Sequence, residues 1–203
     1  MMRRSAGHRR LVIGGVATLV VLVLLALSNL WLELWQLSAA QGTFSMAPGL
    51  PACHGLWLRE GFTYLVRDPH RGEIVTLHAR GQIGGQIIPD PNSRQLEINK
   101  RAIGLPGDTV VGRDNRVYVN GHPADEIPTD PFPAVHLGPK QYFVMGDNRS
   151  ASDDSRDFGP VPRAAIFSRA VLIVWPLGRF GVPTYNEHAK PPGTLCGAAP
   201  DPQ

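Results

Sequence analysis

The sequence predicts a mainly β domain that follows a single transmembrane helix at the N-terminus. Three observations predict this fold class. An uncharged apolar run covers residues 11–32, short alternating apolar segments recur after it, and 22 glycines and 19 prolines are spread through the whole chain. Glycine and proline in this number suit short strands joined by tight turns, as in a β-barrel or sandwich. After the apolar run, no segment shows a convincing helical period over three turns.

The apolar run is long enough to cross a membrane. As a helix its 22 residues would extend over about 33 Å, close to the ~30 Å hydrocarbon core of a bilayer. A cleaved secretory signal has an apolar region of only about 7–15 residues, although the small residues 38–40 (Ser-Ala-Ala) keep that alternative open. We predict a basic tail at residues 1–10 and a transmembrane anchor at residues 11–35.

Charge predicts the orientation of this anchor. Four arginines precede it and no acidic residue appears before Glu33, so the tail is expected in the cytoplasm and the later chain outside it. The whole chain has 20 Lys/Arg and 17 Asp/Glu; four arginines and one glutamate precede Ser38, which leaves 16 of each. The domain is therefore formally neutral, and its charge indicates no nucleic-acid partner.

The later chain is divided into one folded domain at residues 38–188 and a tail at residues 189–203, which we expect to be disordered because it is rich in proline. The domain's expected strands are residues 73–77, 109–111, 116–119, 142–145 and 165–175. Residues 112–115 are expected to close a hairpin and Asn120-Gly121 to start the next turn. Residues 80–95, rich in glycine and proline, are expected to form a flexible loop.

Two cysteines, Cys53 and Cys196, follow the anchor. Outside the cytoplasm an oxidising compartment permits a disulfide between them, which would close a long loop. Two unrelated thiols are the alternative, since the separation of the two Cα atoms decides between them and the sequence does not supply it.

Ser45 is a candidate nucleophile about a dozen residues beyond the apolar run. A serine hydroxyl is a poor nucleophile unless a base removes its proton, and histidine is the usual base. None of the seven histidines stands in a triad or metal-ligand spacing, and each is expected at the surface or in a turn; they are His8, His54, His70, His78, His122, His136 and His188. We predict no metal and no cofactor.

Lysine is the less usual base, and it must be buried to lose its proton near neutral pH. Of the three lysines, Lys190 lies in the tail and Lys140 in a loop-like segment. Lys100 follows apolar residues and precedes a Pro-Gly turn, a context in which a strand can bury it. Taken alone, a strand lysine is more often a surface residue whose stem covers apolar neighbours.

A polar segment at residues 146–159 directly follows an expected strand and is longer than a hairpin turn requires. A long solvated loop is one interpretation. Against it, Asp147, Arg149, Asp154 and Arg156 supply opposite charges that would hold the loop in one geometry.

Residues 45–48, 100–108 and 146–159 resemble, in order and spacing, successive conserved boxes of the type I signal peptidases, and residues 71–75 resemble an intervening box. The similarity extends from about Gly42 to Pro176. This resemblance implies a membrane-anchored serine endopeptidase with a Ser/Lys dyad on a β-rich extracytoplasmic domain. Its implied substrates are the signal peptides of exported preproteins, with Ala-x-Ala-like sites. The implied surroundings are the lipid bilayer of a bacterial cell membrane, close to the secretion translocon.

Carried over residue by residue, the resemblance implies Ser45 as nucleophile and Lys100 as general base. Thr43 would join the Ser45 backbone N–H in the oxyanion hole. The residues implied to orient or brace the site are Ser152, Asp154, Arg156, Arg101 and Asp147. Phe44 departs from the family, where the residue before the serine is commonly small, which leaves the detailed shape of the substrate pocket open.

Three alternatives stay open. A self-cleaving cytosolic repressor would share the Ser/Lys chemistry but should carry a DNA-binding segment in place of the anchor. A non-catalytic anchored β-domain would bind exported proteins without cutting them. A specialised maturation peptidase for one conjugation or pilus substrate is a narrower form of the main interpretation.

Overall fold

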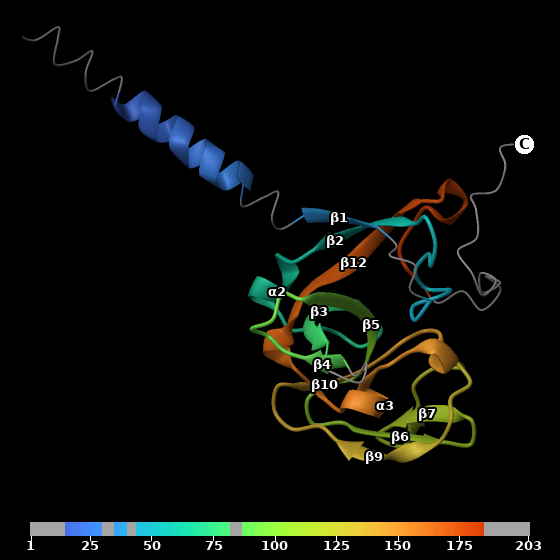
Figure 1. The fold of residues 1–203 in the computed structure, drawn as a ribbon. Coiled ribbons are helices and arrows are strands. Elements are labelled where there is room, and N and C mark those ends of the chain that lie inside the picture. The colour runs from blue at the N-terminus through green and yellow to red at the C-terminus, as the bar shows by residue number, and fades with distance from the viewer. Residues whose placement is uncertain (1–14, 30–34, 40–43, 82–86, 185–203) are drawn as a thin grey trace, which may run out of the picture. The chain divides into compact units, whose positions relative to one another are not determined.

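The computed structural model describes residues 15–29, 35–39, 44–81 and 87–184 (Figure 1). The chain divides into two compact units, residues 1–36 and 37–203. In the first unit residues 15–29 are helical. Within the described part of the chain, no helix is both long enough and apolar enough to span a bilayer. The predicted anchor at 11–35 also includes residues 11–14 and 30–34, which lie outside the described residues, as do the tails at 1–10 and 189–203.

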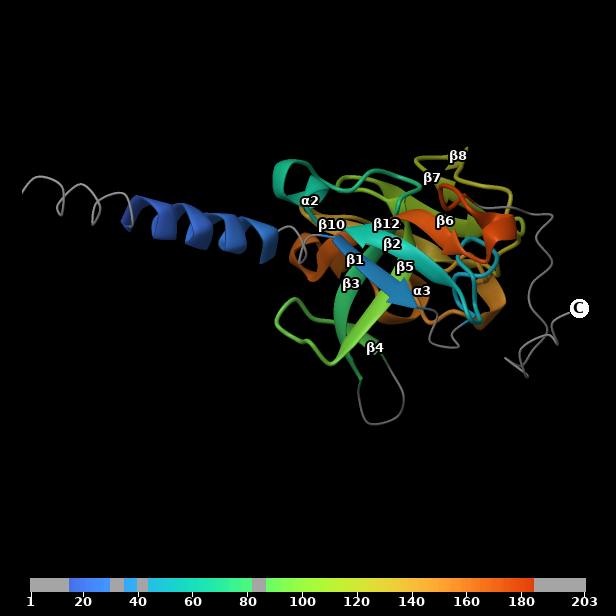
Figure 2. The same ribbon diagram turned by 90° about the horizontal axis from the view of Figure 1, so that it is seen from above.

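The second unit is built on a sheet of eight strands, in which the pairings from β2 through β11 are antiparallel. Seven follow one another in the order β1-β2-β12-β3-β5-β10-β11, and β4 pairs with β3 beside this path. Their bounds are β1 Trp35–Ala39, β2 Leu56–Glu60, β3 Ile74–Gly81, β4 Ile87–Pro89, β5 Leu96–Gly104, β10 Gln141–Met145, β11 Val161–Pro162 and β12 Ile166–Trp175. Figure 2 shows β3 and β4 projecting together from one side of this unit.

A smaller sheet has the order β8-β7-β6-β9, and Figure 1 shows its strands gathered at the end of the unit opposite β2 and β12. The strands are β6 Thr109–Arg113, β7 Arg116–Val119, β8 His122–Pro123 and β9 Phe132–His136. The β6–β7 turn places Asp114 and Asn115 at φ 51° and 59°. The next turn places Asn120 and Gly121 at φ 51° and 83°. Asparagine, aspartate and glycine tolerate these left-handed angles best, which is why they close both hairpins.

Helices in the second unit are short. The two α-helices are α2 Thr63–Val66 and α3 Ser155–Phe158, and the three 3₁₀ turns are η1 Arg149–Ala151, η2 Arg163–Ala165 and η3 Leu177–Arg179. The mainly β architecture predicted from the sequence is confirmed for the described residues, and each of the five expected strands overlaps an observed one.

Two details differ from the sequence-based expectations. The loop expected at residues 80–95 is shorter, because β3 continues to Gly81 and pairs with β4, while residues 82–86 lie outside the described part.

His78 is neither at the surface nor in a turn. It is buried within β3, and its ring stacks on Phe167 at 4.0 Å between centroids. Burial lowers the pKa of His78, and the central position of β3 between β12 and β5 explains that burial.

Three apolar clusters make up the core. One lies along β3, β5, β10 and β12, and a second joins β10 to the smaller sheet. The third contains Met46, Leu50, Trp57, Ile74 and Ile173. Met46 and Leu50 belong to the segment that follows Ser45, so the third cluster attaches this segment to the large sheet.

Candidate active site

Ser45 begins a tight turn whose apolar side chains are anchored in the core. The Ala47 N–H donates to the Phe44 carbonyl at 3.0 Å, and the Leu50 N–H donates to the Met46 carbonyl at 2.8 Å. Met46 and Leu50 are only 5% and 2% exposed. Burial of their side chains is worth about 1.5–3 kcal/mol each, so the turn is held in place while Ser45 itself stays partly accessible.

The polar segment predicted from the sequence docks on this turn. The Asn148 N–H donates to the Ser45 carbonyl at 3.0 Å. A Cβ added to Gly146 would lie 2.4 Å from the Ser45 carbonyl oxygen and 2.2 Å from Ser152 Oγ. Only glycine therefore allows the segment to approach both serines at once.

An ion pair between Arg101 and Asp147 packs against the Ser45 turn. The Arg101 guanidinium donates from Nε and Nη2 to the two Asp147 carboxylate oxygens, each at 2.6 Å, and from Nη1 to the Gly72 carbonyl at 2.7 Å. A Cβ at Gly49 would lie 1.8 Å from Asp147 Oδ2. The ion pair thus packs directly against the backbone of the Ser45 turn.

Arg179, in η3, holds the same turn from the C-terminal side. Its Nη2 donates to the carbonyl of Pro48 and, at 3.3 Å, to that of Gly49. Burial lowers the pKa of Arg179. Sequence reasoning missed this contact. It joins residues 131 positions apart, and no local pattern signals such a contact.

Lys100 lies on β5 between β3 and β10, with Val75 opposite it in the register. It is 2% exposed, and its Nζ donates a hydrogen bond to Ser152 Oγ at 2.8 Å. Burial in this position lowers the pKa of Lys100 to about 8, and the charges of Asp154 and Asp153 oppose a larger shift. A lysine with this pKa exists largely as the neutral amine at mildly alkaline pH, and it is then able to accept a proton.

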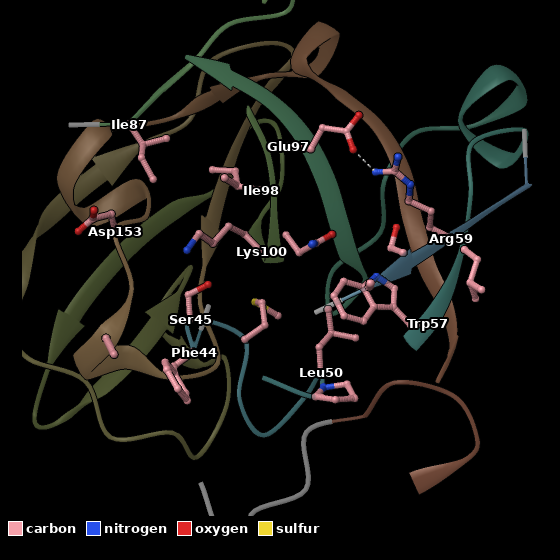
Figure 3. Close-up of a pocket in the computed structure, with 17 residues that line it drawn as sticks. Phe44, Ser45, Leu50, Trp57, Arg59, Ile87, Glu97, Ile98, Lys100 and Asp153 are labelled. Carbon is pink, nitrogen blue, oxygen red and sulfur yellow. Dashed lines mark hydrogen bonds and ion pairs between the residues drawn. The ribbon is translucent and has the colours of Figure 1, made fainter. Parts of the chain in front are cut away.

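Ser45 and Lys100 line one pocket of about 440 Å³. Figure 3 shows the end of the Lys100 side chain next to Ser45, whereas Trp57, Arg59 and Glu97 lie on the opposite side of the pocket. Within the described residues no hydrogen bond joins Ser45 Oγ to Lys100 Nζ. Contacts between catalytic groups are often looser without substrate and tighten when it binds. The structure therefore brings together the nucleophile and the base predicted from the sequence.

Asp154 fixes the loop that carries Ser152. It is fully buried, and its Oδ2 accepts from the Gly146 N–H at 3.0 Å. Its carboxylate also pairs with the Arg156 guanidinium at 2.8 Å, and it caps α3. Burial would raise the pKa of Asp154, but the Arg156 and Gly146 hydrogen bonds outweigh it and hold the pKa below its usual value.

Arg156 and Arg149 complete the loop. Arg156 Nη2 also donates to the backbone carbonyls of Arg149 at 2.7 Å and Ser152 at 3.3 Å. Arg149 is buried and donates to Asp125 and to Thr129, each at 2.6 Å. Asp125 and Thr129 belong to a separate loop before β9 and carry no local motif, so no sequence pattern predicted either contact.

Two predicted residues lie outside the described part of the chain. These are Thr43, implied in the oxyanion hole, and Cys196. Cys53 is not a free thiol, and its pairing with Cys196 stays a prediction. Among the described residues no cluster of three or more histidine, cysteine, aspartate or glutamate side chains is arranged to hold a metal ion.

Comparison with known proteins places the chain in a family. The family model for signal peptidase, peptidase S26, matches residues 13–175. A probable signal peptidase I-2 of Synechocystis is 40% identical over 130 residues, covering 62% of this chain and 57% of that protein. A signal peptidase I of Leptolyngbya laminosa is 37% identical over 142 residues and covers 68% of both chains.

A more extensive match is signal peptidase I P of Bacillus subtilis subsp. natto, which is 30% identical over 190 residues. It covers 86% of this chain and 91% of that protein, whereas the chain spans just over half the length of the Synechocystis relative. The chain belongs to the signal peptidase family, peptidase S26, a family of serine endopeptidases.

Proposed function

We propose that this protein is a membrane-anchored serine endopeptidase that removes signal peptides from exported preproteins by means of a Ser45/Lys100 dyad. One observation carries the proposal. Lys100 is a buried lysine with a pKa of about 8, is hydrogen-bonded to Ser152, and shares a pocket with a partly exposed serine. A buried amine without a carboxylate partner costs stability, and a catalytic base is a physical reason to retain one.

The reaction starts with Lys100 as the neutral amine. Lys100 Nζ takes the proton of Ser45 Oγ while that oxygen attacks the scissile carbonyl, and a tetrahedral oxyanion forms. The Lys100 ammonium then gives this proton to the leaving nitrogen as the peptide bond breaks. Neutral Lys100 then takes a proton from water while the water oxygen attacks the acyl-enzyme ester. The Lys100 ammonium returns this proton to Ser45 Oγ as the ester bond breaks, which releases the signal peptide. Ser152 orients the Lys100 amine throughout.

The oxyanion is stabilised by the backbone N–H of Ser45 and the hydroxyl of Thr43. Within the described residues the Ser45 N–H makes no hydrogen bond, so this donor is available to a substrate. A single donor of this kind typically contributes about 2.7–4 kcal/mol to the transition state. The contacts that hold the turn, from Asn148, Arg101–Asp147 and Arg179, preorganise this donor.

Anchoring places the reaction at the membrane. The anchor would be residues 11–35, whose apolar run covers residues 11–32. The arginine-rich tail would lie in the cytoplasm and the catalytic unit outside it, at the cell membrane. The substrates are signal peptides with small residues at the first and third positions before the cut. The substrate backbone adds as a strand beside the pocket, which is lined by Leu37–Ala39 of the edge strand β1 and by Glu97–Lys100 of β5.

The test is cleavage of a purified preprotein by the full-length protein in detergent or lipid vesicles. Ser45→Ala and Lys100→Ala should each reduce kcat/KM to background, because one removes the nucleophile and the other the base. Arg116→Ala, at an exposed ion pair in the smaller sheet, is the matched control and should cleave normally.

N-terminal sequencing of the product should find the cut after an Ala-x-Ala-like site. Wild-type turnover by the Ser45→Ala or Lys100→Ala variant would refute the dyad. A folded wild-type protein that binds preproteins but never cuts them would favour the non-catalytic alternative.

A further inference from the structure

Two neighbouring aspartates of the active-site loop have opposite environments. Asp154 is fully buried and accepts hydrogen bonds from Gly146 and Arg156. Asp153 is exposed, and within the described residues no hydrogen bond or ion pair reaches its carboxylate. The structural role is thus taken by Asp154 alone, and nothing in the architecture of the loop accounts for a carboxylate at position 153.

Asp153 lines the pocket that contains Ser45 and Lys100. Figure 3 shows it on the far side of Lys100 from Arg59 and Glu97. Its charge acts on Lys100, whose pKa it raises. Asp153 also lines a second pocket, together with Ser152 and Asp130. Its carboxylate therefore stands at the boundary between the catalytic pocket and the adjoining surface.

Among the residues that line the pocket of Ser45 and Lys100, no positive charge offsets the Asp153 carboxylate when Lys100 is neutral. Arg59 and Glu97 form an ion pair at 2.5 Å and cancel. Lys100 is neutral when it acts as base. The remaining formal charge among the residues that line the pocket is the carboxylate of Asp153. A substrate side chain close to the scissile bond therefore meets a net negative potential.

We propose that Asp153 is a specificity-determining residue, which favours a basic side chain and disfavours an acidic one next to the scissile bond of the preprotein. This inference rests on the proposed function, because it concerns the substrate of the same site. The Asp153 carboxylate repels an acidic substrate side chain and attracts a basic one, and both effects contribute to the discrimination between the two substrates. Because Asp153 is exposed, solvent screens the interaction, and we expect up to about fivefold in kcat/KM per substrate charge at low salt.

The experiment measures kcat/KM for a series of preproteins built on one reference substrate with an Ala-x-Ala site. The residue between the two alanines and the first two residues after the cut are changed, one at a time, to lysine or to glutamate. Wild-type protein should prefer lysine to glutamate at one or more of these positions, and added salt should reduce the preference.

Asp153→Asn keeps the shape of the side chain and removes its charge, so the lysine-to-glutamate ratio should fall toward one. Asp130→Asn is the matched control, because it removes an equal exposed charge from the second pocket without touching the first, and it should keep the wild-type ratio. Any effect of either variant on the pKa of Lys100 applies to all substrates equally and cancels in the ratio.

Two outcomes would overturn the inference. One is a wild-type ratio of one or below at every position, and the other is an Asp153→Asn ratio equal to that of the wild type. In both cases the uncharged reference substrate is still cut, and the proposed function stands. Failure of the wild-type protein to cut the reference substrate would instead refute the proposed function.

Discussion

Two cations flank Val75 from the neighbouring strands of the large sheet, and their environments differ: Arg169 is half-buried and Lys100 is buried. The register places Arg169 of β12 opposite Val75 on one side and Lys100 of β5 opposite it on the other. Arg169 pairs with the carboxylates of Glu60 and Glu73. Lys100 forms no ion pair within the described residues and is held only by the hydroxyl of Ser152.

The charged state of each group follows from these partners. Burial would raise the pKa of Glu73, but hydrogen bonds from Arg67, His70 and Tyr64 outweigh it and lower that pKa to about 2. Burial lowers the pKa of Lys100 to about 8 because no carboxylate compensates it directly. Oppositely charged partners keep Arg169 and Glu73 ionised. Lys100 is buried without such a partner, so its neutral amine, which can accept a proton, is favoured.

The largest expected effect is on the free energy of unfolding when Arg169, the cation with carboxylate partners, is replaced. Arg169→Met leaves Glu60, only 1% exposed, without its countercharge, and should lower the free energy of unfolding by about 3–5 kcal/mol. Urea denaturation at neutral pH measures this value. The control Arg116→Met breaks the exposed pair with Glu126 and should change it by less than about 1 kcal/mol. Equal effects of the two variants would contradict the distinction between buried and exposed pairs.

The opposite sign is expected at Lys100. Folding lowers the pKa of Lys100 from 10.5 to about 8. Below that pH the amine is protonated in both states, and burying the charged form lowers the free energy of unfolding. Lys100→Met should raise the free energy of unfolding at pH 7 by up to about 3 kcal/mol.

This gain depends on pH. Between about pH 8 and 10.5 the unfolded state binds more protons than the native state, so wild-type stability rises with pH across that window. The advantage of Lys100→Met should therefore shrink as pH increases. Urea titrations at several pH values give the test, and a gain that is absent at pH 7 or independent of pH would contradict the burial cost assigned to Lys100.

The smallest effect concerns the pH profile of cleavage. The wild-type kcat/KM should rise with pH and level off above about 8, as Lys100 loses its proton. The charged groups that act on Lys100 are Asp154, Asp153 and Asp157, which raise its pKa, and Arg156, which lowers it. Asp153→Asn removes the exposed carboxylate that lines the pocket and should move the rising limb to lower pH. Asp130→Asn should leave the limb in place, and an identical limb in Asp153→Asn would show that this carboxylate does not act on the base.

Local patterns in the sequence were sufficient for much of the architecture. Alternating apolar residues predicted the strands, and residues 112–115 and Asn120-Gly121 predicted the hairpin turns, because backbone angles at a turn depend on the residues within it. The first turn is tighter than predicted, since Gly112 and Arg113 belong to β6. The resemblance to type I signal peptidases implied that Ser45, Lys100, Ser152, Asp154, Arg156, Arg101 and Asp147 belong to one site. The contacts of Lys100 with Ser152, and of Arg101 with Asp147, agree with that prediction.

Other features of the site have no local signal. Asp125 and Thr129 hold Arg149 from 24 and 20 positions away, and Arg179 reaches the nucleophile turn from beyond the residues that the family model matches. The requirement for glycine at positions 49 and 146 depends on which atoms the folded chain places against them. His78 was expected at the surface for the same reason, since only strand order shows that β3 is central.

The sequence by itself determined that a serine, a lysine on an expected strand and a polar loop follow an apolar run, in an order that resembles the type I signal peptidases. Only the tertiary structure decided the burial that lowers the pKa of that lysine and the different environments of Asp153 and Asp154. The physical reason is that a pKa and a charge balance depend on burial and on distances between groups far apart in the chain. Those quantities exist only once β5 lies between β3 and β10 and residues 146–159 close over Ser45.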